Sequence, residues 1–365
     1  VLITVVAMVT AVLALTALRG AEVAREALER GTYYDPAARG MELQHPVLTG
    51  FAVWALAIRF FVVPYPLVVE RTVEPVFSWG DPRWMIGAFL VLLWFALLWR
   101  YRNRSNPGLG IAWLGVTWLP TSGILPATYL LSDRYLYIPC VGFCWVLGYA
   151  LYFLLSHHSL LLRRIGITVA TVAVVSYTWL AVDRNRDWSS ELSLWGSAVQ
   201  HEPANPKVHF NLGNAYMDEG KFALAEEEWN TTLELETDYP QAHVNLGVLY
   251  QKRGDLHTAK SHYEAALDAE PDYGVAQFNL ATLYEELGKR EEAIRLLQEA
   301  AENIGGKRDT PQKKARVFRE LARVLFEAGQ VDRARDAAER SLYHAPEDPV
   351  TRRLYSAIRA AEKES

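Results

Sequence analysis

Apolar residues in the first half of the chain form long uninterrupted runs. Four of these runs reach or approach the roughly 20 residues needed to cross about 30 Å of hydrocarbon; they cover 1–18, 84–99, 138–155 and 165–182. A fifth run, 108–131, contains Pro120 and Pro126, which remove helix hydrogen bonds and predict a kinked span or one packed inside protein. The pattern predicts a multispanning helical membrane domain over 1–182.

The long segment between the first two runs, 19–83, predicts a large loop on one side of the membrane. Within this loop, 47–69 is apolar but has Arg59 at its middle and two prolines near its end. These features predict a helix lying in the membrane interface. Arg59 is a candidate functional residue, because a charge in an apolar stretch is costly unless it is paired or faces a polar cavity.

The second half of the chain repeats itself every 34 residues. Leucine, tyrosine, glycine and alanine recur in phase, as Leu212, Leu246, Leu280; Tyr216, Tyr250, Tyr284; Gly220, Gly254, Gly288; and Ala225, Ala259, Ala293. This pattern predicts an all-α tetratricopeptide (TPR) solenoid over 183–365, built of stacked helix pairs. A half-repeat is expected at 189–203, repeats from about 206, 240, 274 and 315, and a closing helix at 349–362.

Composition supports two unlike halves. Residues 1–182 have 13 basic and 9 acidic residues, net +4, whereas 183–365 have 24 and 33, net −9. A single soluble globule is therefore excluded, as is a nucleic-acid binder, because no basic block is present. Cys140 and Cys144 are the only cysteines, which excludes a disulfide scaffold. Because Val1 lies inside an apolar run, we expect the C-terminal portion of a longer protein.

Arginines in two short loops predict the orientation of the membrane domain. Arg100, Arg102 and Arg104 mark one loop, and Arg163 and Arg164 mark the other. Such residues stay on the cytoplasmic side, and the two loops agree because two predicted spans separate them. The loop 19–83 and everything after residue 182 then lie outside the cytoplasm. We expect an integral membrane protein, of the inner membrane if bacterial, with an extracytoplasmic TPR array.

Three asparagines recur at the same position of successive repeats, and the packing of the helices does not require them; we call them the asparagine ladder. Asn211, Asn245 and Asn279 occupy the sixth position of each first helix, on the face that lines the inner groove of such superhelices. An amide donates and accepts hydrogen bonds, so the ladder suits the backbone of an extended polypeptide. Alternatively, each asparagine bonds to a neighbouring helix and helps set the superhelix pitch. The matching residue of the fourth repeat is Glu320.

Three further polar residues lie two positions before the ladder. They are His209, His243 and Gln277, which we expect to share the polar lining of the groove. A metal site is not predicted, because the repeat spacing separates the two histidines and a third ligand is missing.

A membrane motif and the passage into the repeats resemble a known family. The motif is Trp118-Leu119-Pro120, then Ser132-Asp133-Arg134-Tyr135-Leu136-Tyr137-Ile138-Pro139, then Gly142-Phe143. The passage is Arg184-Asn185-Arg186-Asp187-Trp188, then Leu194-Trp195, Pro203, Asn205 and Asn211-Leu212-Gly213. From about Gly50 onward the chain resembles the tetratricopeptide-repeat O-mannosyltransferase-like membrane proteins. These pair a multispanning GT-C glycosyltransferase domain with luminal or periplasmic repeats.

The resemblance implies sugar transfer from a polyprenyl-phosphate donor to an acceptor, with a divalent metal possible near the phosphate. It makes Arg134 a candidate for binding the donor phosphate, oriented by Asp133, Tyr135 and Tyr137, since a guanidinium matches phosphate oxygens. Alternatively, Arg134 reaches the lipid headgroups and the tyrosines form an interfacial belt. The family's catalytic acid lies in the first outer loop, so it is expected upstream of Val1, and we expect the fragment alone to be inactive.

Two functions follow as hypotheses. The first is the C-terminal part of a membrane glycosyltransferase whose repeats hold an acceptor, most simply a protein. The second is a non-catalytic, membrane-anchored TPR scaffold for protein assembly, because a repeat array by itself indicates interaction and no chemistry. Both need the bilayer and an extended polypeptide or protein partner. No cofactor is predicted to bind this segment itself.

Overall fold

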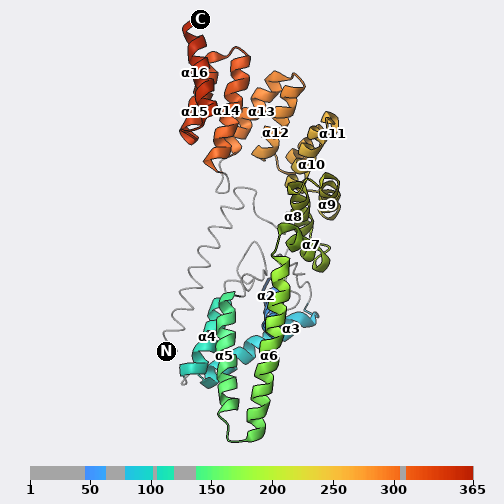
Figure 1. Cartoon of the computed structure of the whole chain (residues 1–365), viewed down its shortest axis with the longest axis vertical. Helices are drawn as coiled ribbons and strands as arrows, with labels where there is room; N and C mark the ends of the chain where they lie inside the picture. Colours follow the sequence, from blue (N-terminus) through green and yellow to red (C-terminus); the bar gives the residue numbers. More distant parts are fainter. Residues whose placement is uncertain (1–45, 63–78, 102–104, 119–136, 305–309, 365) are drawn as a thin grey trace. The chain divides into compact units, whose positions relative to one another are not determined.

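The computed structural model describes residues 46–62, 79–101, 105–118, 137–304 and 310–364. Every regular element in these residues is an α-helix, which confirms the predicted all-α fold (Figure 1). The chain divides into two compact units, Val1–Val208 and His209–Ser365, called below the membrane unit and the repeat unit. The sequence-based boundary at residue 182 falls inside helix α6, Leu160–Asp187.

Six described helices begin in the membrane unit and precede the first full repeat. They are α2 Pro46–Val62, α3 Pro82–Tyr101, α4 Ser105–Trp118, α5 Tyr137–Leu155, α6 Leu160–Asp187 and α7 Glu191–His201. Three of them are long and apolar enough to cross a membrane: α3, α5 from Ile138, and α6. They contain the predicted spans 84–99, 138–155 and 165–182. The predicted span 1–18 lies outside the described residues, as does 108–131 beyond the end of α4.

Helix α2 is the part of the predicted interfacial segment that the structure describes. Val53, Trp54, Ala57 and Phe60 form one buried face, at the three- and four-residue spacing of a helix. This face packs with Leu114 of α4 and with residues of α3 and α5. Arg59 is exposed instead, with its guanidinium carbon 5.6 Å from the centroid of the Phe60 ring. Helix α2 therefore buries one apolar face against its neighbours and leaves Arg59 exposed.

A short turn connects α6 to α7. Ser190 caps α7: its hydroxyl accepts from the amide of Ser193 at 3.0 Å, and the Ser193 hydroxyl accepts from the amide of Ser190 at 3.1 Å. This reciprocal capping satisfies donors at the helix start that have no partner within the helix. Only residues 188–190 separate the two helices, so little chain links the last apolar span to the first repeat-like helix.

The repeat unit is built of helix pairs, as the 34-residue period predicts. The helices are α8 Pro206–Asp218, α9 Phe222–Leu235, α10 Pro240–Lys252, α11 Leu256–Ala269, α12 Gly274–Glu286, α13 Arg290–Asn303, α14 Pro311–Glu327, α15 Val331–His344 and α16 Pro349–Glu364. One core runs from Val244 to Ile358, and α16 closes it with the fully buried Ile358. Covering the last apolar face is what a terminal helix of a solenoid must do.

Recurring glycines make the turn within each pair. Gly220, Gly254, Gly288 and Gly329 all have φ between 73° and 82°. This left-handed conformation costs other residues about 1–2 kcal/mol, so the glycine recurs in phase. Gly213 serves a different need: a Cβ there would lie 2.6 Å from the buried Trp229 ring, so only glycine lets α8 and α9 approach this closely.

The fourth repeat begins earlier than its register suggests. Helix α14 starts at Pro311, four residues before the expected 315, because the Thr310 hydroxyl accepts from the Lys313 amide at 3.3 Å and Pro311 suits the first helical position. The phase of the repeat is nevertheless kept within the helix, where Leu321 and Ala322 are buried.

Candidate functional site

The strongest candidate site is a groove between the first helices of the first three repeats. It encloses about 470 Å³ and is lined by Phe210, Asn214, Met217, Asp218, Trp229, Gln241, Val244, Asn245, Val248, Tyr273 and Val275. Most of these side chains are apolar, and a few amides and one carboxylate stand among them. A mostly apolar groove with a few convergent polar groups is the usual form of a binding site.

An amide pair sets the chemistry of this groove. The Trp229 indole N–H can only donate, and it donates to Asn214 Oδ1 at 3.2 Å, which fixes the orientation of that amide. Asn245 Nδ2 donates to the same oxygen at 2.8 Å. The Asn214 NH₂ and Asn245 Oδ1 make no hydrogen bond with any described residue. The pair therefore offers one donor and one acceptor side by side, as the main chain of an extended polypeptide requires.

Asn245 is the one predicted groove residue that lines this pocket. Asn214 was missed, because the matching residues of the next two repeats are Val248 and Thr282, so no periodicity marks it. Asn211 is half-buried on α8. The half-buried side chain of Asn279 makes no hydrogen bond within the described part of the chain, which leaves its amide open to a ligand.

The other three residues predicted for the groove bond within the array. His209 is buried, with Nδ1 2.7 Å from Glu228 Oε2 on α9. Buried Gln277 donates through Nε2 to the Pro271 carbonyl at 3.1 Å and accepts from Asn303 Nδ2 at 3.0 Å. His243 contacts His262 on α11. These contacts join each first helix to its own second helix or to the preceding turn, so we base the site on the asparagines.

The histidine pair of the second repeat has a defined proton arrangement. His243 Nε2 lies 3.3 Å from the Thr237 carbonyl, which only accepts, so this nitrogen carries the proton. Neutral His243 then accepts through Nδ1 from His262 Nδ1–H, 3.1 Å away. Burial lowers the pKa of both rings, and the His243 charge lowers that of His262 further. The pair therefore favours neutral imidazoles.

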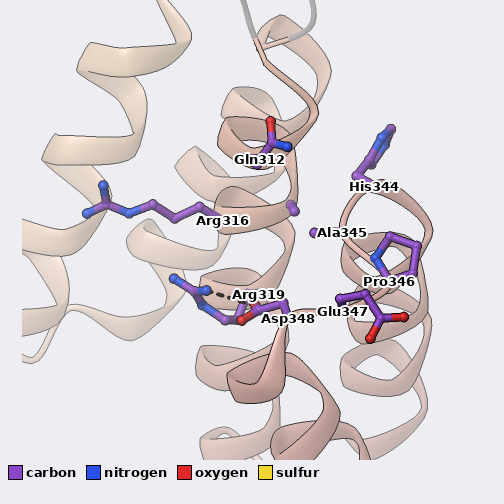
Figure 2. Close-up of a pocket in the computed structure, with 9 residues that line it drawn as sticks. Gln312, Arg316, Arg319, His344, Ala345, Pro346, Glu347 and Asp348 are labelled. Carbon is purple, nitrogen blue, oxygen red and sulfur yellow. Dashed lines mark hydrogen bonds and ion pairs between the residues drawn. The ribbon is translucent and has the colours of Figure 1, made fainter.

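A second pocket lies at the far end of the array, between α14 and the turn from α15 to α16 (Figure 2). It encloses about 450 Å³ and is lined by Gln312, Ala315, Arg316, Arg319, His344, Ala345, Pro346, Glu347 and Asp348. Unlike the groove of the first repeats, its polar lining is mostly charged.

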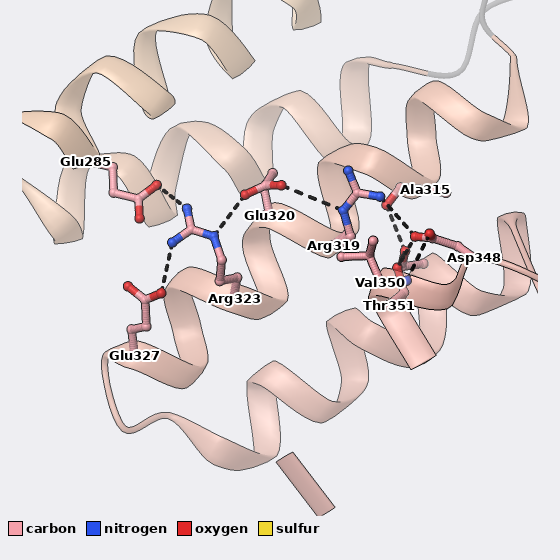
Figure 3. A network of polar contacts seen from close by, with 10 residues as sticks. Glu285, Ala315, Arg319, Glu320, Arg323, Glu327, Asp348, Val350 and Thr351 are labelled. Carbon is pink, nitrogen blue, oxygen red and sulfur yellow. Dashed lines mark hydrogen bonds and ion pairs between the residues drawn. The ribbon is translucent and has the colours of Figure 1, made fainter. Parts of the chain in front are cut away.

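The ladder ends at the fourth repeat in a network of ion pairs (Figure 3). Glu320, the counterpart of the ladder asparagines, lies 3.0 Å from Arg323 Nε and 3.7 Å from Arg319 Nε. Arg323 also pairs with Glu285 and Glu327, and these carboxylates raise the pKa of Arg323 above its ordinary value. Because Glu320 is held between two arginines, it is already paired and does not continue the ladder.

The residues predicted to bind a donor phosphate are mostly outside the described part of the chain. This is so for Asp133, Arg134 and Tyr135, and for the side chain of Tyr137, which begins α5. Their role remains a prediction. Arg59, described above, lies on the exposed face of α2.

Family models match the repeat unit in three places. Two tetratricopeptide-repeat models match residues 238–304 and 315–340, and a TPR-repeat model matches 213–254. Among solved structures, the chain is similar to PilF of Pseudomonas aeruginosa, with 23% identity, 45% of this chain and 71% of that chain covered, and a TM-score of 0.40. It is also similar to the TPR protein TTC0263 of Thermus thermophilus, with 22% identity, 50% and 95% covered, and a TM-score of 0.38.

The curated relatives that the chain matches are named protein O-mannosyl-transferases. The chain is 30% identical to protein O-mannosyl-transferase Tmtc3 of Drosophila melanogaster over 113 residues, 31% of this chain and 12% of the relative. It is 31% identical to human TMTC4 over 147 residues, 38% and 19% of the two chains. For F38B6.6 of Caenorhabditis elegans, identity is 27% over 180 residues, 48% and 25% of the two chains. The chain thus spans a quarter or less of each relative. It contains a tetratricopeptide-repeat array and resembles the protein O-mannosyl-transferases over that array.

Proposed function

We propose that this chain is the C-terminal part of a membrane glycosyltransferase that transfers a sugar from a polyprenyl-phosphate donor to a polypeptide held by its repeats. Two findings support the proposal: the relatives are named protein O-mannosyl-transferases, and three helices are long and apolar enough to span a membrane. Holding the acceptor lowers the entropic cost of bringing its hydroxyl to the donor.

The observation that carries the proposal is the amide pair of Asn214 and Asn245. Its open donor and acceptor lie in a groove whose other walls are largely apolar. Main-chain hydrogen bonds do not depend on side-chain identity, so such a site holds many extended sequences. Asn279 extends the same property into the third repeat. A transferase that modifies several proteins needs this tolerance.

The proposal places the array on the extracytoplasmic side, on the strength of the arginine-rich loops alone. It assigns the donor phosphate to Arg134, with Asp133, Tyr135 and Tyr137 orienting the guanidinium and Arg59 as a further candidate. The carboxylate that activates the acceptor hydroxyl is assigned to a part of the longer protein outside this chain, and a divalent metal at the donor phosphate is compatible with this assignment.

The double variant Asn245→Ala/Asn279→Ala tests the groove. Its binding to fluorescein-labelled, Ser/Thr-rich 12-residue peptides, measured by fluorescence anisotropy with the full chain in nanodiscs, should weaken about tenfold, since each lost hydrogen bond contributes about 0.5–1.5 kcal/mol. Asn230→Ala is the matched control, because Asn230 is exposed on second helix α9. Binding that is unchanged in the double variant would show the ladder to be structural.

The scaffold hypothesis remains the second candidate, because the matches to known proteins lie over the repeats. It shares the groove and lacks the transfer step. Arg134→Ala in the full-length protein separates the two: sugar transfer measured in membranes should fall while peptide binding stays. Unchanged transfer would remove Arg134 from the donor site, and a full-length protein with no transfer at all would favour the scaffold.

A further inference from the structure

The charge of the repeat unit changes sign along its length. Residues 209–304 contain 7 basic and 19 acidic residues, net −12, whereas 310–364 contain 12 basic and 9 acidic residues, net +3. A polypeptide lying along the whole array therefore meets a negative potential over the first three repeats and a positive one over the fourth. Such a field favours one direction and one charge pattern of the bound chain.

The carboxylates at the fourth-repeat pocket already have partners. Asp348 Oδ2 accepts from Arg319 at 2.9 Å and from the Thr351 hydroxyl at 2.5 Å, and these bonds lower the Asp348 pKa. Glu347 lies 2.9 Å from Arg352. Each acid that lines the pocket is thus neutralised by an arginine.

Arg316 is the cation of this pocket that forms no ion pair with any described residue. Its guanidinium carbon lies 5.1 Å from the centroid of the Phe278 ring on α12. Figure 2 shows its side chain extended away from α14 toward the neighbouring helices. An aromatic face supports a guanidinium while leaving its N–H edge free to bind a carboxylate in a bidentate manner.

The position of Arg316 links the pocket to the ladder. Arg316 lies four residues, about one helical turn, before Glu320, the counterpart of the ladder asparagines, so the two positions share a face of α14. Its guanidinium lies against the ring of Phe278 on α12, the helix that also has Asn279. Lys314 adds positive charge on the same helix; burial lowers the pKa of His344, and the Lys314 charge lowers it further. The ladder therefore ends beside an unpaired cation in a positively charged repeat.

From these contacts we infer that Arg316 binds the carboxylate side chain of an aspartate or glutamate in the bound polypeptide. The inference rests on the proposed function, since it names a sequence preference of the same groove. The carboxylate fixes which end of the polypeptide lies at the fourth repeat, while the amides hold its main chain. The acceptors would then share an acidic residue at one side of the bound segment.

Selection from a library of random 12-residue peptides tests this inference. The peptides are displayed with both ends fused, so that carboxylates come from side chains only, and the full chain is presented in nanodiscs. The wild-type chain should enrich an acidic residue several-fold at one position. Arg316→Glu should replace that preference with a basic residue, because the local charge is reversed.

Arg295→Glu is the matched control. Arg295 lies on second helix α13, where its side chain is 70% exposed and its one ion pair with a described residue is to Glu299 of the same helix. It should select the same peptides as the wild-type chain. As a second variant, Arg316→Gln should reduce the affinity ratio between paired Glu- and Gln-containing synthetic peptides, amidated at their C-termini, from about tenfold to near one.

The outcomes separate the two proposals. Peptides that bind the wild-type chain without an acidic preference, or with a preference that Arg316→Glu leaves unchanged, would overturn the role of Arg316 and leave the groove intact. A wild-type chain that enriches no peptide would overturn the polypeptide-binding function and this inference together.

Discussion

Helix α3 of the membrane unit exposes Phe89, Leu92 and Trp99, whereas α14 of the repeat unit buries Val317, Leu321 and Leu325. The outer face of α14 instead has residues such as Lys313 and Glu327. Both helices satisfy their backbone in the same way, so the difference lies in the solvent for which each outer face is suited. Exposed apolar side chains are compatible with lipid, and the charged face needs water.

The two units should differ most when an arginine is placed on an exposed face of each. Val174→Arg alters α6, where Val174 is 64% exposed, and Tyr343→Arg alters α15, where Tyr343 is 82% exposed. Insertion of the α6 span, measured by glycosylation mapping, should become less favourable by about 2.5–3.5 kcal/mol for an arginine near its centre. The repeat unit should lose no more than about 0.5 kcal/mol from its own substitution, measured by urea unfolding. Efficient insertion of Val174→Arg would mean that this face of α6 does not meet lipid.

Replacing a glycine in each unit should also have different effects, of smaller size. Gly254 lies in the turn after α10 with φ 82°, whereas Gly148 lies within α5 and has open space where a Cβ would be added. Gly254→Ala should destabilise the repeat unit by about 1–2 kcal/mol in urea unfolding, because alanine is strained in the left-handed region. Gly148→Ala should leave that transition unchanged. If Gly254→Ala also left it unchanged, the turn would have to adjust without strain.

The sequence predicts the parts of this fold that repeat. Each recurring glycine and alanine reports the same turn or the same close approach, so one period determines four helix pairs. Features that occur once have no such signal. Asn214 joins the candidate site only because Trp229 orients its amide and Asn245 bonds to it from the next repeat. Likewise, the sequence shows Glu320 in place of a ladder amide but not the two arginines that hold it.

The sequence also does not determine the direction of single side chains in the predicted groove. His243 and Gln277 lie two positions before the ladder, which suggests a shared face, yet Gln277 turns back to the Pro271 carbonyl and His243 to its own second helix. A two-residue offset rotates a helical side chain by more than half a turn, so proximity in sequence to the ladder was a weak guide. The membrane motif around Arg134 depends on the resemblance alone.

The smallest predicted effect compares two repeats within the array. His209 faces Glu228 in the first repeat, and His243 faces His262 at the matching positions of the second. Burial lowers the pKa of His243 and of His262. The charged groups that face them, Asp238 and Glu226, oppose this shift. Because the folded pKa values lie below the unfolded value of about 6.5, the pair's contribution is present above pH 6.5 and is lost as the pH falls below it.

His262→Glu gives the second repeat the same histidine–glutamate pair as the first, and it should reverse the pH dependence of the pair's contribution to stability. A carboxylate at 262 stabilises protonated His243, while Glu226 stays held by Tyr250 and Arg253. Between pH 7 and pH 5 the wild-type repeat unit should lose about 0.5–1 kcal/mol through this pair, a modest value because both rings are only partly buried and solvent screens their charges. The variant should lose less, as measured by urea unfolding at the two pH values. Glu228→His is the reciprocal change and should add acid sensitivity to the first repeat. If both variants kept the wild-type pH dependence, carboxylates elsewhere in this acidic unit would determine it.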